Sequence, residues 1–269
     1  IERIPIHLEL QFLSLAYIKS IAELFKKNKD YIFLNIDPLG NLARTGNWFF
    51  DQNKDYEILN AAIESKFDQL FSIDTTLYQN AGTNMVQQLA YAMAHANEYL
   101  NHLHTARKSK RELEKFTFKV SVGSNYFFEI SKLKALRVLW KTLATAYEIS
   151  TACHIIAIPS KRNKTLYEYN ANMIRTTMEG MAAVLGGADT VMNLPYDSIY
   201  KKENKFGSRI ALNQLLLLKE ESYFKEMSKV TQGAYYIETI TSQLAEKALG
   251  LFKTIEKGGG FLPQLKNHN

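Results

Sequence analysis

The sequence predicts an α/β fold: a (β/α)8 barrel of the TIM type, of which about six strand–helix units lie in this chain. Three observations support this prediction. Short apolar segments rich in β-branched and aromatic residues alternate with segments of helical periodicity. The short segments begin roughly every 27 to 46 residues, a spacing typical of strand–helix units. No glycine-rich turn follows the first of them, since residues 11–13 are Gln-Phe-Leu.

Each element can be assigned from these patterns. The composition of buried parallel strands is found at Ile4–Leu10, Tyr31–Ile36, Leu70–Tyr78, Phe116–Val122, Ala152–Pro159 and Thr190–Leu194. Apolar residues three and four apart predict helices at Leu13–Phe25, Met85–Leu103, Phe127–Tyr147, Tyr169–Leu185, Ser208–Glu221 and Tyr235–Glu256. The glycines at 258–260 end the last helix. No linker rich in proline, glycine or serine divides the chain, so we expect one partial barrel domain over residues 1–269.

An open, doubly wound sheet is the alternative to a closed barrel. A nucleotide-binding sheet of that kind carries a glycine-rich turn between its first strand and helix, and this chain lacks one. The pair Gly186-Gly187 precedes a predicted strand instead of a helix. The barrel is therefore favoured. A complete barrel has eight strands, so we expect two strand–helix units to be missing on the N-terminal side.

Composition and motifs argue against several classes of function. No apolar run reaches the roughly 18 residues of a membrane span, so no membrane partner is expected. The lone cysteine, Cys153, lies in an apolar run and is expected to be a buried thiol in a reducing, cytoplasmic environment. The common zinc, dithiol, serine-hydrolase and P-loop motifs are absent, and no metal site is predicted. The net charge is +6, but the densest basic cluster lacks the interleaved aromatics of a nucleic-acid groove; it comprises Arg107, Lys108, Lys110 and Arg111.

Several blocks of sequence resemble the methylmalonyl-CoA mutase family. They are QNAGTNMVQQLAYAMA at Gln79–Ala94, FFEISKLKALRVLW at Phe127–Trp140, NMIRTTMEGMAAVLGGADTV at Asn172–Val191, and Gly233–Thr241 followed by Ile255–Phe261. The blocks follow the family's order and span nearly the whole chain. The resemblance implies a barrel belonging to an adenosylcobalamin-dependent isomerase that interconverts succinyl-CoA and methylmalonyl-CoA.

The chain departs from the family's catalytic pattern at several positions. The resemblance implies an arginine before the Ala-Gly-Thr block, where this chain has Gln79, and a neutral amide cannot form the bidentate pair that arginine makes with a carboxylate. A family His-x-Gln pair is replaced by Ile156 and Ile158, and an asparagine–histidine pair by Val122 and Ser124. Because several donors are lost together, no catalytic residue is predicted and the chain resembles the small, non-catalytic subunit.

The block DPLGNLARTG at Asp37–Gly46 agrees with this assignment, since it resembles small subunits. We expect a strand to end at Ile36 and a loop shaped by proline and glycine to follow at the mouth of the barrel. Asp37 is then an aspartate that fixes the loop and not a catalytic carboxylate.

A cobalamin-binding domain is not expected within residues 1–269. The family's cobalamin domain carries an Asp-x-His-x-x-Gly motif, and none of His95, His102, His104 or His268 has that context. The resemblance therefore implies that adenosylcobalamin is bound by a partner subunit or another domain.

Three hypotheses remain open. The first is a structural subunit paired with a homologous catalytic large subunit, as a heterodimer, or with a second copy of itself. The second is a catalytic acyl-CoA mutase barrel in which His154, two residues before Ile156, acts with Gln79 and Tyr78. The third is a CoA-binding module without chemistry, with Arg175 near the CoA phosphates; Arg175 pairing with Glu179 one turn later is the alternative. A charged, open barrel interior favours chemistry, and an apolar, filled one favours a scaffold.

Overall fold

Six parallel strands form one sheet in chain order, as the sequence predicted. The computed structural model describes residues 5–26, 31–65, 67, 69–105, 116–150, 152–224, 227 and 230–267. The strands are β1 (Ile6–Glu9), β2 (Ile32–Ile36), β3 (Gln69–Asp74), β4 (Phe116–Val122), β5 (His154–Pro159) and β6 (Thr190–Val191). Each strand pairs with the next one in parallel register.

The sheet is curled into a half-barrel. In a flat sheet, five spacings of ~4.8 Å would place β1 and β6 about 24 Å apart. Nevertheless His7 Nε2 on β1 lies 3.3 Å from Thr190 Oγ1 on β6. The rings of His7, Phe33 and His154 also contact one another, with centroids 4.4 to 5.2 Å apart. These side chains fill the interior at the amino-terminal ends of the strands, which we call the foot of the half-barrel.

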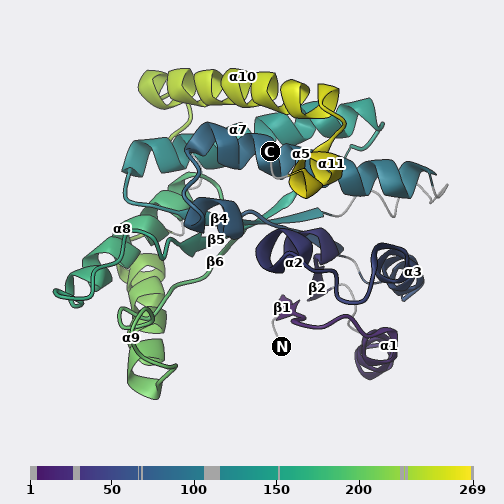
Figure 1. Ribbon diagram of the computed structural model, residues 1–269. Helices are drawn as coiled ribbons and strands as arrows, with labels where there is room; N and C mark the ends of the chain where they lie inside the picture. The colour runs from purple at the N-terminus through teal and green to yellow at the C-terminus, as the bar shows by residue number, and fades with distance from the viewer. Residues whose placement is uncertain are drawn as a thin grey trace.

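Helices cover the outer face of the sheet (Figure 1). The described helices are α1 (Leu15–Leu24), α2 (Pro38–Thr45), α3 (Gln52–Ile63), α4 (Thr76–Asn80), α5 (Met85–Thr105), α7 (Tyr126–Ala146), α8 (Ala171–Leu185), α9 (Lys205–Leu216), a π-helical turn (Leu217–Glu221), α10 (Tyr235–Lys257) and α11 (Phe261–Lys266). Of these, α2 and α4 lie at the carboxyl-terminal ends of the strands. Helix α10 packs across α5 and α7 as an additional layer. The core between sheet and helices includes the fully buried side chains of Phe116 and Phe118, which both contact the buried ring of Trp140.

The predicted strand Leu70–Tyr78 is too long. Strand β3 ends at Asp74, and Tyr78 lies in the short helix α4. The Asp74 carboxylate accepts hydrogen bonds from the Thr76 amide at 3.0 Å and from the Thr76 hydroxyl at 2.5 Å. This local capping turns the chain, while Tyr78 stays buried on the helix. An apolar run alone therefore did not distinguish a strand from a strand followed by a helical turn.

The expected loop at Asp37–Gly46 is a helix, α2. Asp37 is its N-cap and accepts from the Gly40 amide at 2.8 Å, Pro38 occupies the first turn, and Gly46 closes the helix at φ 77°. Aspartate, proline and glycine at these positions are the usual helix boundary signals, so the proline and glycine mark the ends of a helix and not a loop.

Other differences concern elements whose periodicity is weak. Helices α3 and α11 were not predicted; α3 is capped by Asp51, and α11 has only six residues. Helix α9 begins at Lys205, before the predicted Ser208, because Asn204 caps it. Strand β6 stops at Val191 instead of Leu194. Ile4, the basic cluster at 107–111 and His268 lie outside the described residues. None of the described helices has the length and apolarity needed to cross a membrane.

The foot predicts a pH dependence of stability. Burial, with repulsion from His154, lowers the pKa of His7 from 6.5 to about 4, and burial lowers the pKa of His154 as well. Since the folded state disfavours both protonated rings, the free energy of unfolding should be highest above pH 6.5 and decrease as the pH falls toward 4. His7→Phe should flatten this decrease in urea denaturation measured across that range. His104→Phe, at an exposed position of α5, serves as the control, and an unchanged slope in His7→Phe would contradict the assignment.

Candidate functional site

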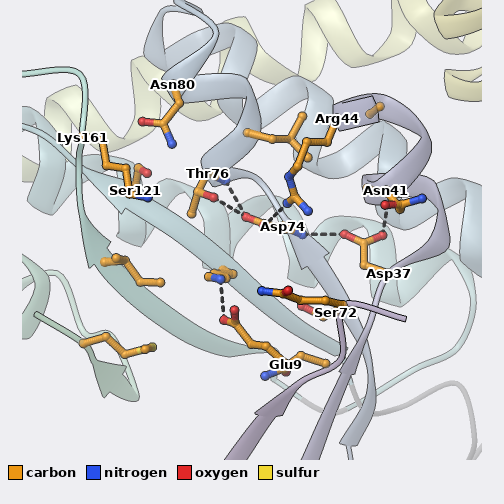
Figure 2. Close-up of a pocket in the computed structure, with 18 of the residues that line it drawn as sticks. Glu9, Asp37, Asn41, Arg44, Ser72, Asp74, Thr76, Asn80, Ser121 and Lys161 are labelled. Atoms are coloured by element: carbon orange, nitrogen blue, oxygen red, sulfur yellow. Dashed lines mark hydrogen bonds and ion pairs between the residues drawn. The ribbon is translucent and has the colours of Figure 1, made fainter. Parts of the chain in front are cut away.

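A cavity of about 850 Å³ opens at the carboxyl-terminal ends of the strands. Parallel barrels place their binding sites at this end, because the loops that follow the strands converge there. Figure 2 shows polar side chains from strands and loops directed into this cavity. The polar and charged residues that line it are Glu9, Gln11, Asn35, Asp37, Asn41, Arg44, Ser72, Asp74, Thr76, Asn80, Lys119, Ser121, Lys161 and Asn193. The interior is thus open and polar at the mouth, and filled by rings at the foot.

Most charges of the cavity are paired with one another. Lys119 on β4 forms an ion pair with Glu9 on β1, which crosses the concave face in front of β2 and β3. Arg44 on α2 binds Asp74 at the end of β3, with 2.5 Å between Nη2 and Oδ2 (Figure 2). The lining therefore holds both signs of charge and no strong excess of either.

The buried carboxylate of Asp37 connects the elements around the mouth. Its Oδ1 accepts from the Gly40 amide, from the Tyr99 hydroxyl at 2.7 Å and from His95 Nε2 at 2.9 Å. Its Oδ2 accepts from the Asp74 amide at 2.9 Å. Burial by itself raises the pKa of Asp37, but the interactions with His95, the Asp74 amide and Tyr99 outweigh it and keep the pKa below 3.8. The interpretation of Asp37 as a residue that fixes local structure therefore agrees with its contacts.

Tyr78 and Gln79 lie behind the cavity lining. The Tyr78 hydroxyl is 3.0 Å from His95 Nδ1. When His95 carries its proton on Nε2 and donates it to Asp37, Nδ1 accepts a hydrogen bond from Tyr78, so both ring nitrogens are hydrogen-bonded. The Gln79 side chain is 8% exposed and exchanges hydrogen bonds of 2.8 and 3.0 Å with the Ser160 hydroxyl. Both side chains are occupied in bonds that hold α4 in place.

His154 is remote from Gln79. It lies at the start of β5, in the foot, where its Nε2 is 3.0 Å from Thr190 Oγ1. Gln79 binds Ser160, which directly follows the other end of β5, and six residues of strand span about 20 Å. The structure does not bring the two residues of the catalytic hypothesis together.

The remaining positions from the sequence comparison differ in their surroundings. Ile158 lines the cavity, and Ile156, on the same strand face, is fully buried. Val122 packs into an apolar cluster between the sheet and the helices, so its neighbour Ser121 is the residue that faces the cavity, and Ser124 is exposed. Lys119 and Ser121 are polar residues two positions apart on β4, and this alternation is the signal in the sequence that indicates the lining.

Arg175, on α8, bonds to the loop that precedes this helix. Its guanidinium donates to the carbonyl of Asn163. Glu179 is instead paired with Lys164 at 2.7 Å, and both side chains are almost completely buried. The alternative role of Arg175, a pair with Glu179, is therefore wrong, because Glu179 pairs with Lys164. Helical spacing could not reveal this partner, since Lys164 lies in the loop that precedes α8. The contact of Arg175 with a CoA phosphate stays a prediction.

The described histidines do not fit a cobalt-ligating site. His95 uses both ring nitrogens internally and stacks on Phe261, and His102 stacks on Tyr56. Neither the mouth cavity nor a second cavity beside α9 has a histidine among its lining residues. Within the described part of the chain, no group of three metal-binding side chains is found. Burial also raises the pKa of Cys153 to about 12, as expected for a structural thiol.

Comparison with known proteins identifies the family of this chain. Residues 25–268 match the methylmalonyl-CoA mutase family. The chain belongs to the methylmalonyl-CoA mutase family. It is 36% identical to the methylmalonyl-CoA mutase small subunit of Porphyromonas gingivalis over 91% of this chain and 41% of that protein. It is 32% identical to the small subunit of Streptomyces virginiae, over 87% of this chain and 39% of that protein.

A mutase that is not described as a small subunit matches less of the chain. The methylmalonyl-CoA mutase of Rhizobium meliloti is 32% identical over 72% of this chain and 28% of its own length. The chain spans about two fifths of the length of the small subunits it matches. The resemblance to small subunits thus extends over more of the half-barrel than the resemblance to this mutase.

The Asp37 network predicts a large effect of a small substitution. Asp37→Asn places an amide where four donors converge, and should lower the free energy of unfolding by about 3 kcal/mol in urea denaturation at neutral pH. Because the pKa of Asp37 is lowered, its stabilisation is present above pH 3.8 and is lost as the pH falls below it. Asp51→Asn, at the N-cap of α3, is the matched control and should cost less than about 1 kcal/mol. Equal costs for the two variants would be incompatible with the network.

Proposed function

We propose that this chain is the barrel of a methylmalonyl-CoA mutase small subunit, with a structural role beside a homologous catalytic large subunit. The family is adenosylcobalamin-dependent. In this proposal the cobalamin is bound by the partner subunit or another domain, and the partner carries out the interconversion of succinyl-CoA and methylmalonyl-CoA.

The observation that carries this proposal is the state of the residues at the family's catalytic positions. Gln79 is buried against Ser160, Ile158 presents an apolar surface to the cavity, and Val122 faces away from it. Where the family has an arginine, this chain has Gln79, which cannot pair with the carboxylate of an acyl-CoA bound there. Burying that carboxylate without a cationic partner is costly. The match to two small subunits over about nine tenths of the chain supports the same conclusion.

One observation favours a second candidate function, a barrel that still binds or converts an acyl-CoA. The cavity at the mouth is open and polar, and it contains the cations Arg44, Lys119 and Lys161. An open, charged interior favours catalysis or binding, and the mouth has that character. A filled interior favours a scaffold, and the foot is filled by rings. The separation of His154 from Gln79 weakens the catalytic form of this alternative.

The structural role predicts a division of labour. The full-length protein that contains this chain should show no isomerisation of succinyl-CoA in the presence of adenosylcobalamin, and should form a complex with a homologous large subunit that turns over substrate. Size-exclusion chromatography with light scattering distinguishes this heterodimer from a homodimer. Full activity from the protein without its partner would refute the proposal.

A second measurement addresses His154 directly. In the assembled enzyme, His154→Gln should leave kcat within about twofold, because the imidazole serves the packing of the foot. A general acid or base normally contributes about 10²- to 10⁴-fold, so a loss of that size would establish the catalytic alternative. Thermal unfolding of the same variant reports the structural effect separately.

A further inference from the structure

One cation of the mouth cavity is left without an ion pair. Lys161 is exposed, lines the cavity and lies two residues beyond the end of β5. Among the described residues, no carboxylate pairs with its ammonium group. The other two cations of the lining are paired, Lys119 with Glu9 and Arg44 with Asp74. Lys161 is therefore the positive charge that a ligand can reach without breaking an existing ion pair.

The remaining carboxylate of the lining does not neutralise Lys161. Asp37 accepts hydrogen bonds from four donors, which occupy both of its oxygens. Figure 2 shows Asp37 and Lys161 at opposite sides of the cavity, with Asp74 and Thr76 between them. An anion beside Lys161 thus meets a cation whose charge is not taken up by a neighbouring carboxylate.

Asn80 lies on the same side of the mouth as this cation. Helix α4 is fixed to the end of β5 because the Gln79 side chain exchanges hydrogen bonds with the Ser160 hydroxyl. Asn80 and Lys161 each follow one of these two bonded residues, so both come to this side of the mouth (Figure 2). The Asn80 side chain is exposed and bonds to none of the described residues. Its amide N–H groups are available to donate to a ligand.

Ser121 contributes a hydroxyl from the wall of the same cavity. The Ser160 amide donates to the carbonyl of Val122 at 2.7 Å, which holds this end of β4 beside the segment that carries Lys161. Ser121 is only 2% exposed, and its hydroxyl has no partner among the described residues. Unlike the enclosed carboxamide of Asn35, this hydroxyl keeps accessible surface. A nearly buried donor that is still reachable from the cavity is suited to a ligand that accepts there.

We propose that Lys161, Asn80 and Ser121 form a subsite for an oxyanion, the carboxylate or phosphate of a small organic molecule. Lys161 supplies the charge, and the other two side chains each donate a hydrogen bond to the same group, which strengthens the charge-assisted contact. Ile158, opposite Ser121 in the β4–β5 register, and Met192 offer apolar surface in this cavity to the rest of the molecule. The subsite goes beyond the structural role proposed above and does not depend on it.

Saturation-transfer NMR on the full-length protein tests this subsite, with butyrate as the carboxylate probe and butyramide as its neutral analogue. Butyrate should bind saturably, and butyramide should not bind at the same concentrations, because it lacks the charge that Lys161 attracts. Inorganic phosphate, added as a competitor, distinguishes the two sources of the oxyanion. Displacement of butyrate by less phosphate than butyrate identifies a phosphate as the preferred group, and weaker displacement identifies a carboxylate.

Two substitutions test the residues. Lys161→Gln should weaken butyrate binding by about tenfold or more, because it removes a charge-assisted hydrogen bond. Ser121→Ala should weaken it by about threefold to tenfold, because it removes one neutral donor and leaves the backbone carbonyl bonded to Lys132. Lys141→Gln is the matched control: Lys141 is exposed on α7 and does not line the cavity, so butyrate binding should be unchanged. Thermal unfolding of each variant verifies that the fold is retained.

Four results would overturn the proposal. The first is no binding of either butyrate or phosphate. Equal binding of butyramide is the second, since the cavity would then not select an anion. Unchanged butyrate binding in Lys161→Gln is the third, because it would place the probe elsewhere in the protein. The fourth is weaker binding in Lys161→Gln together with unchanged binding in Ser121→Ala, which would reduce the effect to the general attraction of an exposed lysine.

Discussion

The arrangement of the barrel mouth depends on one buried carboxylate. Asp37 stands where β2 ends and α2 begins, and its two oxygens accept from the backbone of α2, the backbone of β3 and two side chains of α5. A buried charge is tolerated only when hydrogen bonds replace the water it has lost, and here four donors do so. Asp37 thereby fixes the position of α2, which carries Arg44. It also fixes the backbone at Asp74, the residue that Arg44 binds.

The interior of the half-barrel has two parts of different character. At the foot, aromatic and imidazole rings from β1, β2 and β5 pack together, and His7 reaches Thr190 across the curled sheet. At the mouth, polar groups surround an open cavity, and their charges are largely neutralised in pairs. A scaffold requires only the first part. The second part, an open and polar cavity, is not needed by a scaffold.

Buried ion pairs recur behind this surface. Lys132 is paired with Glu129 at 2.6 Å and also donates to Gln88 and to the carbonyl of Ser121. Lys164 and Glu179 tie the loop after β5 to α8. Such pairs add little net stability compared with apolar residues, but they require a defined geometry, because a partner left alone is strongly unfavourable. They therefore fix the loops that follow β4 and β5 in one arrangement.

The sequence by itself determined the parallel six-stranded order, most helix positions and the family. Alternation of short β-branched segments with helical periodicity is a local property, and it is sufficient for that purpose. The tertiary structure decided which residues meet. Helix α2 was visible in the capping residues Asp37, Pro38 and Gly46, but it was interpreted as a loop. Lys164 as the partner of Glu179, and the distance between His154 and Gln79, depend on the curl of the sheet and on loop paths that no periodicity encodes. That the Asn35 side chain bonds to none of the described residues is likewise a property of the assembled interior, because it depends on where every neighbouring segment is placed.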